Sequence, residues 1–288
     1  MTRRRWIASV ASAALVGAAV DAFAVEPNRV TVTRHRLGTL GGAMARIAQL
    51  TDLHLQSVGR HEERIAAAVA ALRPDLILLT GDSVDHAGSL DLLDGFLALL
   101  DAGTPKLAIL GNWEHWAGVD LPRLARVYER RNCQLLRNES VVLPFGQAEL
   151  LVTGLDDLVG GSPDVHAALA GVMPRPNHLL LAHCPMHREA YHAALGATPA
   201  GGDASPLGID RRAMRPQLML AGHTHGGQVA PFGWAPLRPP GSGRYVRGWY
   251  RDDDIALYVS RGLGTSILPA RFCAPPEIAY FEWALSAT

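Results

Sequence analysis

The chain has 288 residues, of which 48% are hydrophobic and 19% are charged. This length and composition suffice to bury one large core or two small ones. Lys plus Arg and Asp plus Glu number 27 each, so no net basic charge would attract nucleic acid, and we expect no nucleic-acid partner. The 12 histidines stand out instead, because histidine is the commonest metal ligand and carries protons near neutral pH.

The first 24 residues have the pattern of an export signal. Residues 3–5 are three arginines, an apolar run follows from Ile7 to Val20, and Ala22-Phe23-Ala24 offers a cleavage site between small residues. Arg3-Arg4 also resembles a twin-arginine signal, which exports folded proteins. The apolar run is shorter than the roughly 20 residues of a bilayer span. We therefore expect a cleaved signal or an uncleaved N-terminal anchor, with residues 25–288 forming one domain in the periplasm or on the outer face of the cytoplasmic membrane.

Short apolar runs alternate with helical stretches along the rest of the chain. Apolar residues at helical spacing predict helices around residues 65–72, 93–100 and 121–128, and Ser162-Pro163-Asp164 predicts a further helix start. This alternation predicts an α/β fold with a partly parallel central sheet. We expect buried strands at residues 46–50, 76–80, 106–110, 150–155, 178–182 and 218–221, and tail strands at 255–260 and 277–283.

Two stretches rich in glycine and proline, residues 196–212 and 231–243, are longer than ordinary connections. They flank a histidine motif, so they either shape a substrate entrance or are surface loops without a role.

Metal-ligating residue types follow five of the predicted strands. In open α/β sheets, ligands gather beyond the carboxyl ends of the strands, so these segments are expected to converge. Glycine precedes three of the candidates, which permits a close approach of backbone to a site. The candidate ligands are Asp52, His54, Asp82, Asn112, His183, His223 and His225.

The candidate ligands are of types that bind the same class of metal ion. If strand geometry persists, alternate residues place Asp52 beside His54 and His223 beside His225. Imidazole and carboxylate without thiolate suit Zn, Fe or Mn. Two such ions about 3.5–4 Å apart would clamp a phosphoryl group and hold a bridging hydroxide for in-line attack. The spacing of Cys133, Cys184 and Cys273 does not fit a thiolate site, and all three are expected to be small buried hydrophobes.

The ordered motifs resemble those of the calcineurin-like metallophosphoesterase superfamily from about residue 46 to residue 226. The tail segments 260–264 and 274–278 resemble the exported bacterial branch that carries twin-arginine signals. The resemblance implies a four-layer α-β-β-α sandwich of two mixed sheets. It also implies that Asp82 bridges two metals. Asp52, His54 and His225 would complete one metal site, and Asn112, His183 and His223 would complete the other.

One position departs from the family pattern. The family usually has Gly-Asn-His followed by Asp or Glu, and that histidine protonates the leaving group or steadies the phosphate. Here Trp113 takes its place, followed by Glu114 and His115. Either His115 takes over the role from two residues further along, or His115 is a packing residue and the leaving group departs unaided. Arg261 could contact phosphate as a planar donor, or could simply be solvated.

The sequence therefore predicts a dinuclear metal-dependent hydrolase of phosphate esters or pyrophosphates, either a phosphodiesterase or a phosphomonoesterase. The resemblance associates such exported enzymes with lipid-linked phosphates, and a membrane surface is a further expected partner. The alternative is a non-catalytic metal-binding protein on the same fold, for which Trp113 is the supporting feature.

Overall fold

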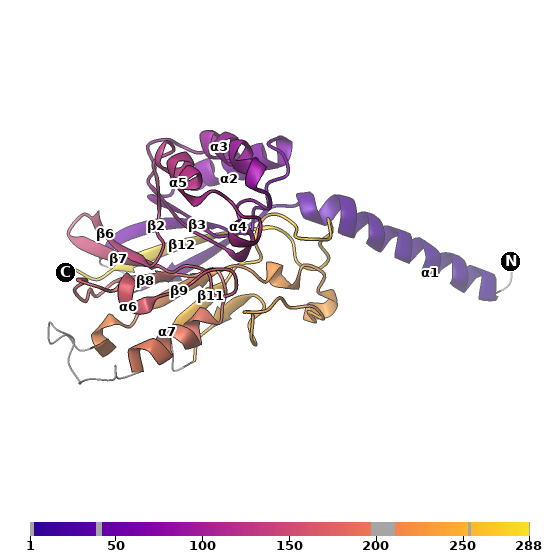
Figure 1. The fold of residues 1–288 in the computed structure, drawn as a ribbon. Helices are drawn as coiled ribbons and strands as arrows, with labels where there is room; N and C mark the ends of the chain where they lie inside the picture. The colour runs from indigo at the N-terminus through magenta and orange to yellow at the C-terminus, as the bar shows by residue number, and fades with distance from the viewer. Residues whose placement is uncertain (1–2, 39–41, 197–210, 253–254, 288) are drawn as a thin grey trace.

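The computed structural model describes residues 3–38, 42–196, 211–252 and 255–287. Two six-stranded mixed sheets pack face to face, and helices cover their outer faces (Figure 1). The predicted four-layer α-β-β-α sandwich is confirmed.

The first sheet has the strand order β1-β12-β2-β3-β4-β5. Strands β2 to β5 run parallel to one another, whereas β12 is antiparallel to β2 and parallel to β1. Its outer face carries α2 (Arg60–Leu72), α3 (Leu90–Leu99) and α5 (Leu121–Glu129). The strands are β1 (Thr31–Leu37), β2 (Ala43–Leu50), β3 (Leu76–Thr80), β4 (Lys106–Ile109), β5 (Cys133–Leu135) and β12 (Glu277–Leu285).

The second sheet has the order β10-β11-β9-β8-β7-β6. Strands β7, β8, β9 and β11 are parallel, and the two edge strands pair antiparallel. The short α6 (Val165–Ala168) and α7 (His187–Gly196) lie on its outer side (Figure 1). The strands are β6 (Glu139–Phe145), β7 (Ala148–Gly154), β8 (His178–Leu181), β9 (Leu218–Ala221), β10 (Gly248–Tyr250) and β11 (Ala256–Val259).

The apolar runs are continuous because both faces of the central strands are buried. In β3, Leu76 and Leu78 face the core between the sheets, whereas Ile77 and Leu79 face the helices. Successive side chains of a strand point to opposite faces, so a strand covered on both sides reads as an unbroken apolar run.

The four strands absent from the predictions are all edge strands: β1, β5, β6 and β10. In β1, half-buried residues alternate with exposed ones, so the strand contains no apolar run. The start of α6 also differs, because Asp164 rather than Ser162 caps the helix by accepting a hydrogen bond from the Ala167 amide. Of the long loop predicted at 196–212, residues 197–210 lie outside the described residues.

The N-terminal helix α1 (Arg3–Val20) projects away from the sandwich (Figure 1). A π-helical turn (Asp21–Val25) and a 3-10 turn (Glu26–Asn28) join it to β1. Buried Glu26 accepts hydrogen bonds from the amides of Cys273 and Ala274, so the base of α1 is attached to the C-terminal part of the chain. No helix among the described residues is both long enough and apolar enough to cross a bilayer.

Candidate metal centre

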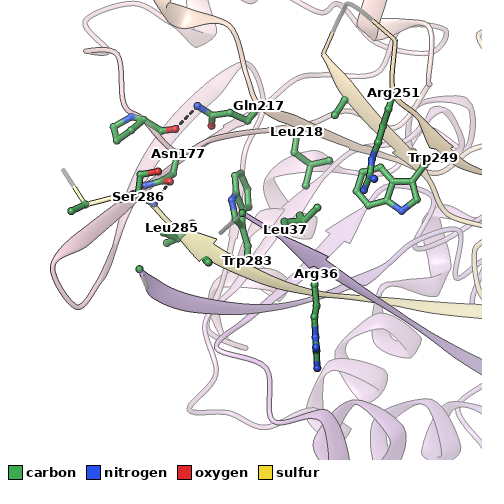
Figure 2. A pocket seen from close by; sticks show the side chains of 16 residues that line it. Arg36, Leu37, Asn177, Gln217, Leu218, Trp249, Arg251, Trp283, Leu285 and Ser286 are labelled. Carbon is green, nitrogen blue, oxygen red and sulfur yellow. Dashed lines mark hydrogen bonds between the residues drawn. The ribbon is translucent and has the colours of Figure 1, made fainter. Parts of the chain in front are cut away.

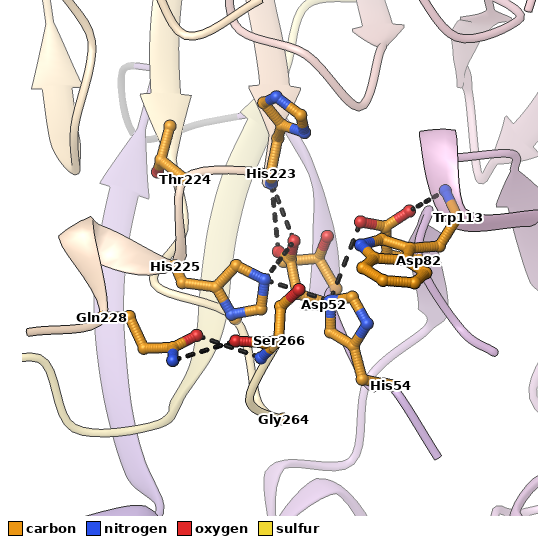
Figure 3. Close-up of polar contacts among 12 residues, drawn as sticks. Asp52, His54, Asp82, Trp113, His223, Thr224, His225, Gln228, Gly264 and Ser266 are labelled. Atoms are coloured by element: carbon orange, nitrogen blue, oxygen red, sulfur yellow. Dashed lines mark hydrogen bonds and ion pairs between the residues drawn. The ribbon is translucent and has the colours of Figure 1, made fainter. Parts of the chain in front are cut away.

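The seven candidate ligands converge at the end of the sandwich where the parallel strands of both sheets terminate. Asp52, Asp82 and Asn112 follow β2, β3 and β4 of the first sheet, and the histidines at 183, 223 and 225 follow β8 and β9 of the second. Six of the seven form two buried groups, and within each group the donor atoms lie within 4.8 Å of one another. Figure 3 shows the first group together with Asp82 and His223 of the second. The groups are Asp52, His54 and His225, and Asp82, His183 and His223.

Asp82 belongs to the second group and also approaches the first. Its Oδ2 is 3.0 Å from Nε2 of His183 and 3.7 Å from Nε2 of His54. A carboxylate in this position can contact two ions at once, the arrangement that a dinuclear site needs. His223 and His225, which continued strand geometry would place side by side, fall into different groups, and this division is the one that the family resemblance implies.

The expectation that strand geometry continues through the ligands is wrong. Strand β2 ends at Leu50 and a 3-10 turn begins at His225. Five of the seven candidates have φ angles in the left-handed region, which is uncommon for residues other than glycine, although Asp and His adopt it more often than most. Such strain gathers at functional sites that the surrounding structure holds in place. The five are Asp52 (51°), His54 (44°), Asp82 (52°), His223 (72°) and His225 (51°).

The glycines before the ligands are required by close packing. A Cβ on Gly111 would collide with the Asp82 carboxylate, and one on Gly222 would collide with Asp52. Gly81 combines a φ of 91° with a close approach to the ring of His183. Any larger residue at these positions would displace the candidate ligands.

The histidine rings are oriented as metal ligands are. His183 Nδ1 lies 2.8 Å from the Thr80 carbonyl oxygen, and His223 Nε2 lies 2.7 Å from that of Pro240. His54 Nδ1 contacts the Asp85 carboxylate, which leaves its Nε2 facing Nε2 of His225 at 3.0 Å. In each ring one nitrogen has an outer partner and the other points into the cluster, as in protein metal sites.

Asn112 supplies the remaining donor. Among the described residues, its buried amide oxygen Oδ1 has no hydrogen-bond partner. A buried polar atom without a partner is costly, and coordination of a cation would remove that cost. The donor set and this oxygen therefore fit two metal ions of the Zn, Fe or Mn type.

Burial and neighbouring charges shift the pKa values of the cluster residues. Burial alone would raise the pKa of Asp82, but the neighbouring His183 and His54 hold it below its usual range. Conversely, burial alone would lower the pKa of His183, but the carboxylates of Asp82, Asp52 and Asp157 together raise it above its usual value. Burial, followed by the charge of His183, lowers the pKa of His223 to about 4, so this ring is neutral at pH 7, as a metal ligand must be.

Glu114 supports two ligand loops, a role that the sequence analysis missed. It lies in α4 (Asn112–Trp116), a short helix that directly follows β4. Its buried carboxylate accepts hydrogen bonds from the amides of Ser83 at 2.6 Å, Gly111 at 2.9 Å and Asp82 at 3.1 Å. The Gly-Asn-x-Glu spacing was the available signal, since a helix-start glutamate commonly accepts from the capping amide.

His115 lies on the same helix. Its Nε2 is 2.7 Å from Oδ1 of Asp156, and the other carboxylate oxygen of Asp156 accepts from Arg137 Nε at 2.9 Å. Trp113 lies against the cluster instead, with its ring in edge contact with His54 at a centroid distance of 5.8 Å. Either role for His115 remains a prediction.

Arg261 forms hydrogen bonds with β1 and with the segment that precedes β12. Its guanidinium donates to the Pro275 carbonyl at 3.0 Å and to the Thr31 hydroxyl at 3.0 Å. The arginine that reaches a ligand is Arg271, which is fully buried and has Nη2 3.5 Å from His225 Nδ1. Burial lowers the pKa of Arg271 to about 10. No local motif marks Arg271 in the sequence, and the contact of Arg261 with phosphate remains a prediction.

Cysteine burial is only partly as predicted. Cys133 and Cys184 are buried, but Cys273 is exposed, because it lies on a surface turn with a φ of 58°.

A separate cavity of about 750 Å³ opens at the far end of the sandwich, where β9 and β11 begin (Figure 2). Trp249, Trp283, Arg36 and Arg251 are among its lining residues. None of the seven candidate ligands lines it, so the metal cluster and this cavity are distinct features.

Comparison with known proteins identifies relatives of this chain. Residues 45–227 match the family described as calcineurin-like phosphoesterase. The chain is 30% identical to the uncharacterized metallophosphoesterase YkuE of Bacillus subtilis, with 98% of this chain and 97% of the relative covered. It is 28% identical to the phosphodiesterase YaeI of Escherichia coli, with 89% of each covered.

Among solved structures, the protein TT1561 of Thermus thermophilus is similar with a TM-score of 0.46 and 14% identity. The match covers 76% of this chain and 90% of that one.

Proposed function

Because this chain belongs to the calcineurin-like phosphoesterase family, we propose that it hydrolyses a phosphate ester or pyrophosphate with two metal ions at the cluster around Asp82. The observation that carries the proposal is the pair of buried histidine-carboxylate groups, in which Asp82 of the second group also approaches His54 of the first. The bound ions would supply Lewis-acid activation of the phosphoryl group and of the attacking water. The chain's own residues orient the ligand rings and exclude bulk water from them.

The first experiment measures metal content and turnover together. The purified full-length protein, loaded with Zn, Mn or Fe, is assayed on an aryl phosphodiester and an aryl phosphomonoester. Asp82→Asn should lower kcat/KM by more than about 100-fold, because loss of an outer partner alone costs up to that much. The exposed Asp91→Asn is the matched control. Two bound metals without turnover on either ester would favour the non-catalytic metal-binding alternative.

Hydrolysis also requires a residue that protonates the leaving group. Trp113 replaces the family's histidine, and an indole N–H donates hydrogen bonds but is too weakly acidic to protonate a leaving group near neutral pH. We propose that His115 provides the proton, from its position one helical turn beyond Asn112. His115→Ala should then slow hydrolysis of an alkyl phosphodiester roughly 100-fold or more and that of an aryl phosphodiester much less. Equal effects on both substrates would rule out this role.

We further propose that the protein acts outside the cytoplasm on lipid-linked phosphates. The twin-arginine pattern at Arg3-Arg4 and the apolar segment that follows support export. A screen of the full-length protein against phospholipids, nucleotide-linked lipids and soluble esters tests the substrate class. Exclusive turnover of soluble nucleotides would contradict it.

A further inference from the structure

Five large apolar side chains are exposed on two loops beside the metal cluster, and we call them the apolar rim. In a soluble monomer, exposed apolar patches of this kind mark interaction sites. The rim comprises Phe232 (105% exposed), Ile267 (95%), Leu237 (82%), Trp234 (69%) and Leu268 (45%).

The two loops of the rim are one structural unit. Gln228 donates to the carbonyls of Ser266 at 3.1 Å and Leu268 at 2.7 Å, and it accepts from the Ser266 amide at 3.0 Å (Figure 3). A β-bridge joins Val229 to Phe272. The exposed side chains are therefore held in a fixed arrangement rather than on independent tips.

The same loops are continuous with the metal ligands. The Gln228 amide donates to the carbonyl of His225 at 2.9 Å, and the Gly264 amide donates to that of Asp52 at 2.7 Å. A surface that binds to the rim would therefore lie next to the metal cluster.

Two of the exposed side chains of the rim lie on strained backbone. Phe232 has a φ of 54° and Ile267 a φ of 62°, in the left-handed region where bulky and β-branched residues are genuine outliers. Asparagine would relieve this strain in either loop, yet the chain has apolar residues there. Strain retained together with nearly complete exposure indicates that the side chains have a binding partner.

Two features, together with the aromatic side chains of the rim, indicate that this partner is a lipid surface. The amide of Arg271 donates to the carbonyl of Ala22 at 2.8 Å, so α1, with its exposed apolar residues, leaves the body next to the rim (Figure 1). Residues 226–251 and 261–276 contain no Asp or Glu but include arginines, among them exposed Arg238. Aromatic and basic side chains together favour the interface of an anionic bilayer.

We propose that the apolar rim inserts into the headgroup region of a lipid bilayer and holds the metal cluster against the membrane surface. This inference rests on the proposed location at a membrane, but it requires no phosphoesterase activity. Interfacial segments bury their apolar side chains about 5–10 Å into the headgroup and acyl boundary.

The test measures depth at single positions of the full-length chain. In a Cys273→Ser background, Trp234→Cys or Leu268→Cys receives an environment-sensitive fluorophore, and Met173→Cys, an exposed apolar site away from the rim, is the control. Vesicles of phosphatidylglycerol and phosphatidylcholine carry brominated acyl chains. We expect roughly a twofold loss of fluorescence at 234 and 268 and little at 173, given the insertion depth of such segments.

A second variant separates the rim from α1. Phe232→Asn with Ile267→Asn keeps the left-handed turns, because asparagine tolerates them, while removing the apolar surface. It should reduce quenching at 234 to the level at 173, whether or not α1 binds the vesicles. Vesicle-bound protein whose label at 234 stays in water would overturn the proposal. So would a vesicle-independent dimer cross-linked through Trp234→Cys, which would assign the rim to a second copy.

Failure of the proposed function gives a different result. A chain that hydrolyses no phosphoester but shows quenching at 234 and 268 would refute the activity and support the rim. A chain that hydrolyses soluble phosphodiesters but shows no quenching at 234 and 268 would support the activity and refute the membrane insertion of the rim.

Discussion

At the scale of single residues, the site depends on side chains that orient the ligands as much as on the ligands themselves. Asp85 contacts Nδ1 of His54 and also accepts from Gln56 at 2.8 Å. Arg271 has a comparable position at Nδ1 of His225, whereas Glu114 holds the backbone of the Asp82 loop through the Asp82 amide. The contacts at His54 and His225 determine which ring nitrogen faces the cluster, and ligand basicity follows from that.

Asp85→Asn should lower metal affinity about 10- to 100-fold, because the amide replaces a charged acceptor at His54 with a weaker neutral one. Competition with a fluorescent chelator measures the change. Asp91→Asn, an exposed carboxylate on α3, provides the matched control. Unchanged affinity in the Asp85 variant would show that the contact with His54 does not tune the site.

At the scale of an element, β8 carries a buried histidine that is not a ligand. His178 begins the strand and has Nε2 2.8 Å from the Thr153 hydroxyl of β7. Burial lowers its pKa to about 4. The folded protein therefore holds this ring neutral in the middle of the second sheet.

This burial makes the stability of the sheet depend on pH. An unfolded histidine has a pKa of about 6.5, so between that pH and about 4 only the unfolded state binds the proton. The free energy of unfolding should fall by roughly 3 kcal/mol across this window and be unaffected above it. His178→Gln should remove that part of the slope in urea titrations, whereas His166→Gln on the exposed side of α6 should not. An unchanged slope for the first variant would refute the assignment.

At the scale of the whole molecule, the metal cluster joins the two sheets. Asp52, Asp82 and Asn112 belong to the first sheet, and His183 and His223 to the second. Bound ions would therefore stabilise the packing of one sheet on the other, because the unfolded chain has no preformed site.

Chelation should lower the melting temperature by roughly 10 °C. A ligand at 1,000 times its dissociation constant adds about 4 kcal/mol, and each kcal/mol shifts Tm by about 2–4 °C in a domain of this size. Scanning calorimetry with and without a chelator measures the shift, and Asp82→Asn should show a smaller one. Complete metal removal, verified by elemental analysis, without a change in Tm would contradict this coupling.

The α/β class, the central strands and the candidate ligands could be predicted from the sequence. Strands buried on both faces, such as β3, have unbroken apolar runs, and glycine before Asp82 or Asn112 marks close approach. Parallel strands that end at one edge bring their following residues together whatever the details of packing. Local chemistry was therefore sufficient to predict the residue types and their convergence.

Only the tertiary structure decided the contacts that spacing along the chain does not show. The family resemblance implied that His223 and His225 belong to different metal sites, whereas strand alternation would have placed them together, and the left-handed turns account for their separation. The edge strands, the contact of Arg271 with His225 and the attachment of α1 beside the apolar rim all depend on residues far apart in the chain. Spacing along the sequence records periodicity within an element, but contacts between distant elements follow from packing, which no local pattern encodes.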